Sequence, residues 1–165
     1  GRFMPQKNQA FLVDVLADVL PSKPNAMIVF VGDGPDKPAV QQHAEELGIA
    51  DHILFLGQRS DVNRLYQAFD VFCLPSLYEG LCIVGVEAQR AGLPCLFADA
   101  ITREVDVTKS SRFMSMESVK GWSSFIATLE SGARVSLSEE MFSDYDISRN
   151  AQKLTAMYIK LFEKK

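Results

Sequence analysis

Hydrophobic residues along the first hundred positions of the chain alternate between two spacings. Residues 11–20 place Phe, Leu and Val at the intervals of one helix face, and the pattern stops at Pro21. Residues 26–31 instead form a continuous apolar run, which is typical of a strand buried on both faces of a parallel sheet. A polar helix is then expected over about 37–47 and a short strand over 53–56.

The same alternation continues to residue 98. It predicts a helix that is capped by Ser60 and runs to Phe69, a strand over 70–74, a helix after Gly80 and a strand over 94–98. Strands and helices that alternate through short connections containing glycine predict an α/β fold, a Rossmann-like parallel sheet with helices on both faces.

Beyond residue 110 the pattern changes. Residues 112–114 are expected as an edge strand, 116–130 as a helix and 146–163 as a closing amphipathic helix, with Asp146 as its N-cap. Without repeats or a low-complexity linker, residues 1–165 are interpreted as a single domain.

The composition of the chain indicates a globular protein and argues against some classes of function. The chain is 47% hydrophobic and 23% charged, as in ordinary globular proteins. Its formal net charge of −4 and its lack of a Lys/Arg cluster argue against a nucleic-acid-binding protein, which needs a basic face for phosphate contacts. Cys73, Cys82 and Cys95 lie in apolar contexts without metal-ligand spacing, so we interpret them as reduced core residues of a cytoplasmic protein.

The segment from Phe69 to Glu87 is the most informative part of the chain. A strand leads through a loop containing Gly80 into a helix, and such loops lie at the strand ends where open α/β sheets bind ligands. Glu79 is expected on the loop and Glu87 about two turns into the helix, on an apolar side where a buried carboxylate needs a partner. Vicinal hydroxyls of a sugar or ribose are suitable donors, so two carboxylates suggest two sugar rings.

The spacing of Glu79-Gly80, six residues and Glu87 resembles the donor-site motif of group 1 glycosyltransferases, the family 4 retaining enzymes with the GT-B fold. Five further segments appear in the order expected of that family's carboxyl-terminal domain, and together they cover about residues 1–105. These segments are Gly1 to Asn8, Phe30 to Pro35, Ile53 to Gly57, Asp70 to Ser76 and Ala91 to Pro94.

This resemblance implies roles for the charged residues. Arg2 and Lys7 match the arginine and lysine that neutralise the donor diphosphate, Glu79 the residue that holds the transferred sugar, and Glu87 the one that holds the ribose. No metal and no cofactor are implied, and we assign Asp146 to a helix cap rather than to the Asp-x-Asp metal motif that residues 144–146 superficially match.

The remaining implied contacts come from backbone groups and one arginine. The amides that follow Gly80 would face the phosphates at a helix N-terminus, Gly34 would lie near the nucleotide, and Arg59 matches the nucleobase region, with an ordinary surface arginine as the equal alternative. Residues 99–104 retain Glu104 but lack the usual pair of glycines, and the usual Gly-Phe-Gly is replaced by residues 80–82. The phosphate-facing amides are those of Leu81, Cys82 and Ile83.

The resemblance further implies transfer of a hexose, with retained configuration, from a UDP- or GDP-linked donor to an acceptor hydroxyl, in bacterial exopolysaccharide or capsule synthesis. The acceptor, a glycan or a lipid-linked sugar, would bind an amino-terminal domain that this chain lacks, so the chain alone is expected to be inactive. The family's first strand is missing too, which would leave a slot between strands 26–31 and 70–74. We expect a cytoplasmic enzyme that associates peripherally with the inner face of the membrane.

Two alternatives stay open at this point. A GT-B nucleotide-sugar 2-epimerase would need only the donor. A flavodoxin-like or receiver module shares the size and the alternating pattern, but neither gives a role to the unit formed by Glu79 and Glu87.

Overall fold

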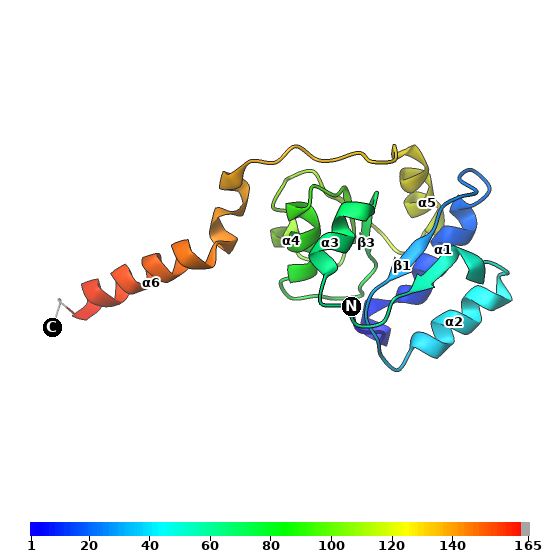
Figure 1. Ribbon diagram of the computed structural model, residues 1–165, viewed down its shortest axis with the longest axis horizontal. Helices are drawn as coiled ribbons and strands as arrows, with labels where there is room; N and C mark the ends of the chain where they lie inside the picture. Colours follow the sequence, from blue (N-terminus) through cyan, green and yellow to red (C-terminus); the bar gives the residue numbers. More distant parts are fainter. Residues whose placement is uncertain (163–165) are drawn as a thin grey trace. The chain divides into compact units, whose positions relative to one another are not determined.

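Five short parallel strands form two sheets in the computed structural model, which describes residues 1–162 (Figure 1). In the first sheet, β1 (Ile28–Phe30) pairs with β2 (Ile53–Phe55), with Ile28 opposite Ile53. In the second, β4 (Cys95–Ala98) lies between β3 (Phe72–Leu74) and β5 (Arg112–Met114). The predicted strands and the α/β architecture are therefore confirmed.

Residues 1–7 form hydrogen bonds with the loop that follows β1 and with the loop that follows β3. β1 and β3 belong to different sheets. In the loop after β1, the carbonyl oxygen of Asp33 accepts the N–H of Phe3 at 3.0 Å. In the loop after β3, the N–H of Leu77 donates to the carbonyl oxygen of Gln6 at 2.8 Å. Residues 1–7 thus lie against the loops that follow β1 and β3, at the edge where parallel sheets bind ligands.

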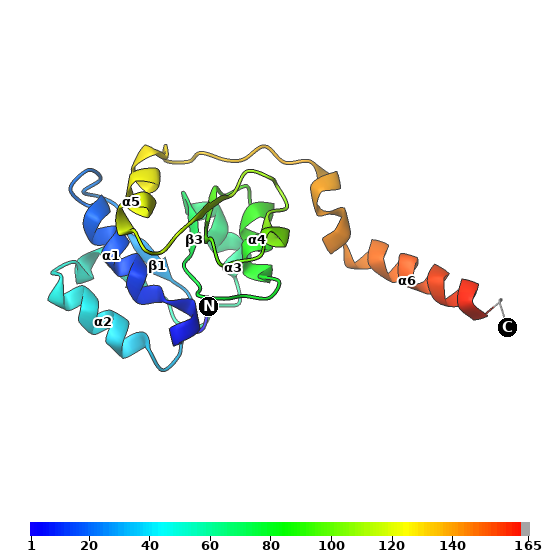
Figure 2. The same cartoon turned by 180° about the vertical axis from the view of Figure 1, so that it is seen from behind.

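Helix α1 (Gln9–Val19) packs against both α2 (Lys37–Glu46) and α5 (Val119–Thr128), as both ribbon views show (Figures 1 and 2). The rings of Phe11 on α1 and the fully buried Trp122 on α5 meet edge to face, with their centroids 5.3 Å apart. The apolar face predicted for residues 11–20 is the face of α1 that is buried.

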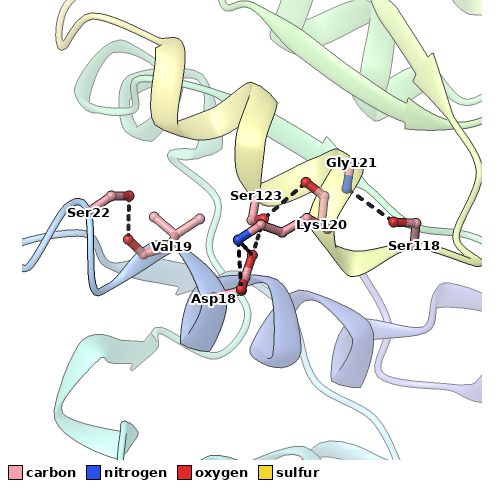
Figure 3. A network of polar contacts seen from close by, with 7 residues as sticks. All are labelled: Asp18, Val19, Ser22, Ser118, Lys120, Gly121 and Ser123. Carbon is pink, nitrogen blue, oxygen red and sulfur yellow. Dashed lines mark hydrogen bonds and ion pairs between the residues drawn. The ribbon is translucent and has the colours of Figure 1, made fainter.

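Polar contacts reinforce the junction of α1 and α5 (Figure 3). The hydroxyl of Ser123 donates to the carboxylate of Asp18, and Lys120 Nζ lies 3.2 Å from the same carboxylate. These hydrogen bonds, that from Ser123 first, hold the pKa of Asp18 below its usual range. Ser118 caps the start of α5 by accepting the N–H of Gly121.

Helices α3 (Val62–Leu65) and α4 (Ile83–Arg90) follow β2 and β3, and α4 packs against β3 and β4. A Cβ on Gly85 of α4 would lie 2.9 Å from Val105 Cγ2, so this glycine permits close packing. The N-cap of α3 is Asp61 rather than Ser60. Short 3-10 turns occupy Pro5–Lys7, Ala50–His52, Tyr66–Ala68 and Arg103–Val105.

The chain packs into two compact units, Gly1–Val135 and a second unit that begins at Ser136. The second contains the 3-10 turn Glu139–Tyr145 and α6 (Ile147–Phe162); the predicted last residue of this helix, 163, lies outside the described residues. Asp146 accepts the N–H of Arg149 at 3.0 Å, which confirms it as the N-cap of α6. Among residues 1–162, no helix has the length and apolar character needed to cross a membrane.

Candidate functional site

Hydrogen bonds join the segment before α1 to the loop after β3. Gln6 takes part in both: its carbonyl oxygen accepts the N–H of Leu77, and its Nε2 donates to the carbonyl oxygen of Tyr78 at 2.8 Å. Two segments more than seventy residues apart in sequence are therefore held in register by one residue. Neighbouring side chains of the two segments, Lys7 and Glu79, come together as a result.

Lys7 and Glu79 form an ion pair. The ammonium group of Lys7 donates to Glu79 Oε1, and the side chains are 21% and 10% exposed, respectively. The next residue, Asn8, has a left-handed backbone conformation with φ of 50°, which ends the turn Pro5–Lys7 and starts α1. Asparagine tolerates this conformation better than most residues do. The structure thus brings together two of the predicted site residues, one cationic and one anionic.

Arg2 belongs to the same segment, and Gly34 lies against its backbone. The side chain of Arg2 is exposed, and its carbonyl oxygen accepts a hydrogen bond from Gln9 Nε2 at 2.9 Å. A Cβ on Gly34 would lie 2.2 Å from the carbonyl oxygen of Phe3, and one on Gly32 would lie 1.9 Å from that of Gly1. Both glycines therefore let the chain's own backbone approach, and the predicted place of Gly34 near a nucleotide stays a prediction.

The N-terminus of α4 lies directly after the Glu79 loop. Its N-cap residue is Cys82, whose side chain makes no capping hydrogen bond. Leu81 and Ile83 are exposed, and a Cβ on Gly80 would have no neighbour within 4 Å. A helix start without a side-chain cap presents backbone N–H groups and a positive dipole end, both of which suit a phosphate.

Glu87 is exposed, so the prediction that it is buried is wrong. It lies on the same outward face of α4 as Ile83 and Arg90, four and three residues away, whereas the residues on either side of it are buried. Its partner is a tyrosine hydroxyl: Tyr66 donates to Glu87 Oε2 at 3.3 Å. Burial, and then the charge of Glu87, raise the pKa of Tyr66 and keep its hydroxyl a donor.

Arg59 is engaged elsewhere. Its guanidinium group makes a bidentate ion pair with Asp61, with both N–O distances 2.8 Å. The pair raises the pKa of Arg59 and lowers that of Asp61. In this structure the guanidinium group of Arg59 is therefore paired with Asp61, and its contact with a nucleobase stays a prediction.

A fully buried amide positions the loop that carries Glu104. Gln89 Nε2 donates to the carbonyl oxygens of Gly85 at 2.9 Å and Val105 at 2.6 Å. Its Oε1 accepts both the N–H and the hydroxyl of Thr108 at 3.1 Å. This network ties α4 to residues 105–108, and Glu104 lies on the surface at the start of that connection.

Sequence reasoning missed the supporting residues Gln6, Tyr66 and Gln89. Gln6 adjoins Lys7, which is a weak local signal, but its partners lie more than seventy residues away. Tyr66 is separated from Glu87 by 21 residues and reads as one more apolar position in a short helix. Gln89 is the one amide in an otherwise apolar buried face of α4, and that position could have marked it.

Comparison with known proteins gives a consistent result. Residues 1–111 match the family model described as glycosyl transferases group 1. EpsF of Bacillus subtilis, named as a glycosyltransferase, is 37% identical over 136 residues, which cover 81% of this chain and 35% of EpsF. The Vi polysaccharide biosynthesis protein VipC/TviE of Salmonella typhi is 41% identical over 99 residues, 60% of this chain and 17% of that protein. The chain thus spans about a third or less of the length of these relatives.

A third relative and two solved structures extend the comparison. An Escherichia coli enzyme named UDP-Gal:alpha-D-GlcNAc-diphosphoundecaprenol alpha-1,3-galactosyltransferase is 33% identical over 102 residues, 60% of this chain and 26% of that enzyme. Anabaena Alr3699/HepE, crystallised with UDP-glucose, aligns with a TM-score of 0.69 and 26% identity over 78% of this chain and 36% of its own. TarM of S. aureus aligns with a TM-score of 0.73 and 18% identity, over 78% of this chain and 27% of TarM, and so shows the fold alone.

Proposed function

Because the chain belongs to the glycosyl transferases group 1 family, we propose that it is the donor-binding part of an enzyme that transfers a hexose from a nucleoside diphosphate sugar. Glycosyltransferase membership sets aside the receiver and flavodoxin alternatives. The observation that carries the proposal is the Lys7–Glu79 pair beside the start of α4. A cation and free helix amides suit a diphosphate, and an adjacent carboxylate suits sugar hydroxyls.

Each residue has a part in this proposal. Arg2, Lys7 and the amides of Leu81, Cys82 and Ile83 bind the diphosphate and stabilise the charge that develops when it leaves. Glu79 accepts hydrogen bonds from the transferred sugar. Glu87 accepts them from the ribose, with Tyr66 orienting its carboxylate. Gly34 and Arg59 lie toward the nucleotide.

We expect transfer with retained configuration. The bond between the anomeric carbon and the β-phosphate oxygen breaks, and the acceptor hydroxyl oxygen bonds to that carbon on the same face. The hydroxyl proton passes to the departing phosphate oxygen, so the leaving group acts as the base. Lys7 lowers the energy of this step by pairing with the phosphate as its negative charge grows.

The donor and pathway are proposed from the relatives. HepE, at 26% identity, was crystallised with UDP-glucose, which favours a UDP-linked hexose over a GDP-linked one. Relatives named for Vi polysaccharide and for a diphosphoundecaprenol acceptor favour bacterial surface polysaccharide synthesis. The acceptor is then a glycan or lipid-linked sugar bound by an amino-terminal domain of the intact enzyme, which works in the cytoplasm at the inner face of the membrane.

Calorimetric titration of the chain with a panel of nucleotide sugars tests the proposal. UDP-glucose and UDP-galactose should bind, and free glucose should not, because most contacts are made to the diphosphate. Purified alone, the chain should transfer no sugar, since the acceptor side of the site is supplied elsewhere. The absence of nucleotide-sugar binding, or transfer by the isolated chain, would contradict the proposal.

A further inference from the structure

Lys7 and Glu79 are held in contact by the backbone around them. Their ion pair is flanked by the two hydrogen bonds of Gln6, and both side chains are largely shielded from water. A mostly buried ion pair in a fixed scaffold is less screened than a surface pair, so removing one charge changes the local potential strongly. Any anion that approaches Lys7 must therefore also approach the carboxylate of Glu79.

The two nucleotides that occupy this site in a catalytic cycle differ at one point. In the donor, the terminal phosphate is esterified to the sugar and carries one negative charge. In the product, the same phosphate is free and ionises a second time near pH 6, so it carries about one more negative charge at neutral pH. The sugar hydroxyls, which would donate hydrogen bonds to Glu79, are gone from the product.

We propose that Glu79, besides binding the sugar, makes the site select the nucleotide sugar over the nucleoside diphosphate product. With donor bound, its carboxylate meets neutral hydroxyl donors. With product bound, it meets an additional phosphate charge, and Lys7 cannot neutralise both anions. This repulsion favours release of the product, a step that limits turnover in many enzymes. The inference rests on the proposed function, since it needs the diphosphate at Lys7.

A purely structural role for the pair makes a different prediction. If Glu79 only held Lys7 in place, its neutralisation would loosen Lys7 and weaken every ligand that carries a phosphate. If Glu79 repels the product, Glu79→Gln releases Lys7 to the phosphate and strengthens binding of the diphosphate while weakening that of the nucleotide sugar. The opposite signs for two ligands separate the two accounts.

Calorimetry on the full 165-residue chain with UMP, UDP and UDP-glucose tests this. For Glu79→Gln, we expect UDP to bind about fivefold to tenfold tighter, UDP-glucose to bind about tenfold more weakly, and UMP to change less than about twofold. Glu79→Asp keeps the charge and should retain the wild-type preference against UDP. Glu45→Gln, an exposed glutamate on α2, controls for the change in net charge.

The outcomes separate this inference from the proposed function. Weaker or unchanged UDP binding by Glu79→Gln, with weaker UDP-glucose binding, would overturn product discrimination and leave the donor-site assignment standing. Wild-type protein that binds neither nucleotide would overturn both. Circular dichroism and the unfolding midpoint of each variant establish that it is folded before it is compared.

Discussion

The two glutamates of the Glu79–Glu87 unit occupy contrasting surroundings. Glu79 lies on the loop after β3, is largely shielded from water, and pairs with the ammonium group of Lys7. Glu87 lies on the exposed face of α4, and its hydrogen-bond donor is the neutral hydroxyl of Tyr66. The carboxylate of Glu79 is paired with a cation, whereas that of Glu87 accepts a hydrogen bond from a neutral hydroxyl.

This difference follows from desolvation. A carboxylate that loses most of its water needs a strong partner, whereas an exposed one keeps water on its free lone pairs. The difference in surroundings also matches the part of the ligand that each glutamate is proposed to bind. The position beside the phosphates meets ligands of different charge, while the position beside a ribose meets only neutral hydroxyls.

Removing the cation should have the largest effect. Lys7→Ala is expected to weaken UDP binding by about 1.5–3 kcal/mol, the range of a hydrogen bond to a charged group, and to leave uridine binding almost unchanged. Titration calorimetry with both ligands measures the difference. Lys120→Ala on α5, where the lysine pairs with Asp18, is the matched control and should change neither affinity. Equal losses for UDP and uridine would show that Lys7 does not bind the diphosphate.

Glu87→Gln should weaken UDP and UDP-glucose equally, by about 1 kcal/mol, because both ligands contain the ribose. Tyr66→Phe should have a smaller effect in the same direction, since it removes only the donor that orients the carboxylate. Competition titrations with the two ligands check the equality. A loss confined to UDP-glucose would move Glu87 from the ribose to the transferred sugar.

The backbone at Asn8 offers a comparison within one position. Asn8→Ala should cost about 1 kcal/mol of unfolding free energy and weaken UDP binding, because alanine resists the left-handed conformation that follows Lys7. Asn8→Gly should retain UDP affinity, since glycine adopts that conformation freely. Urea unfolding and UDP titration measure the two effects. If both variants bind UDP like the wild type, the conformation at Asn8 does not position Lys7.

The junction of α1 and α5 gives a control away from both glutamates. The pKa of Asp18 is lowered in the folded state, so its contribution to stability is present above its unfolded pKa of about 3.9 and is lost as the pH falls through the folded value. Asp18→Asn should therefore be slightly less stable than the wild type at pH 7, and the difference should disappear in acid. Urea unfolding at several pH values tests this, and UDP affinity at pH 7 should not change.

The sequence indicated the fold well because its strands are short apolar runs and its helices are amphipathic. Residues 26–31, 53–56 and 94–98 each contain an observed strand, and α1 buries the apolar face expected of it. The resemblance led to Lys7 and Glu79, which the structure places in contact. The expected burial of Glu87 was wrong because neighbouring apolar residues do not fix which face of a helix turns inward.

Local sequence patterns could not predict the contacts made by Gln6 and Tyr66. Gln6 pairs with residues of a distant loop, and Tyr66 reaches Glu87 from another helix. Such partners are decided by how elements pack, and no spacing along the chain encodes them. The bidentate pair of Arg59 with Asp61 is local, but a sequence gives no means of choosing between that carboxylate and a ligand.

A structure of the chain with UDP-glucose bound tests most directly whether Glu79 binds the transferred sugar and Glu87 binds the ribose. We expect the carboxylate of Glu79 within hydrogen-bond distance of the glucose hydroxyls, that of Glu87 within hydrogen-bond distance of the ribose hydroxyls, and Lys7 beside the diphosphate. A nucleotide bound with its ribose at Glu79, or bound away from the loop that joins β3 to α4, would contradict the account.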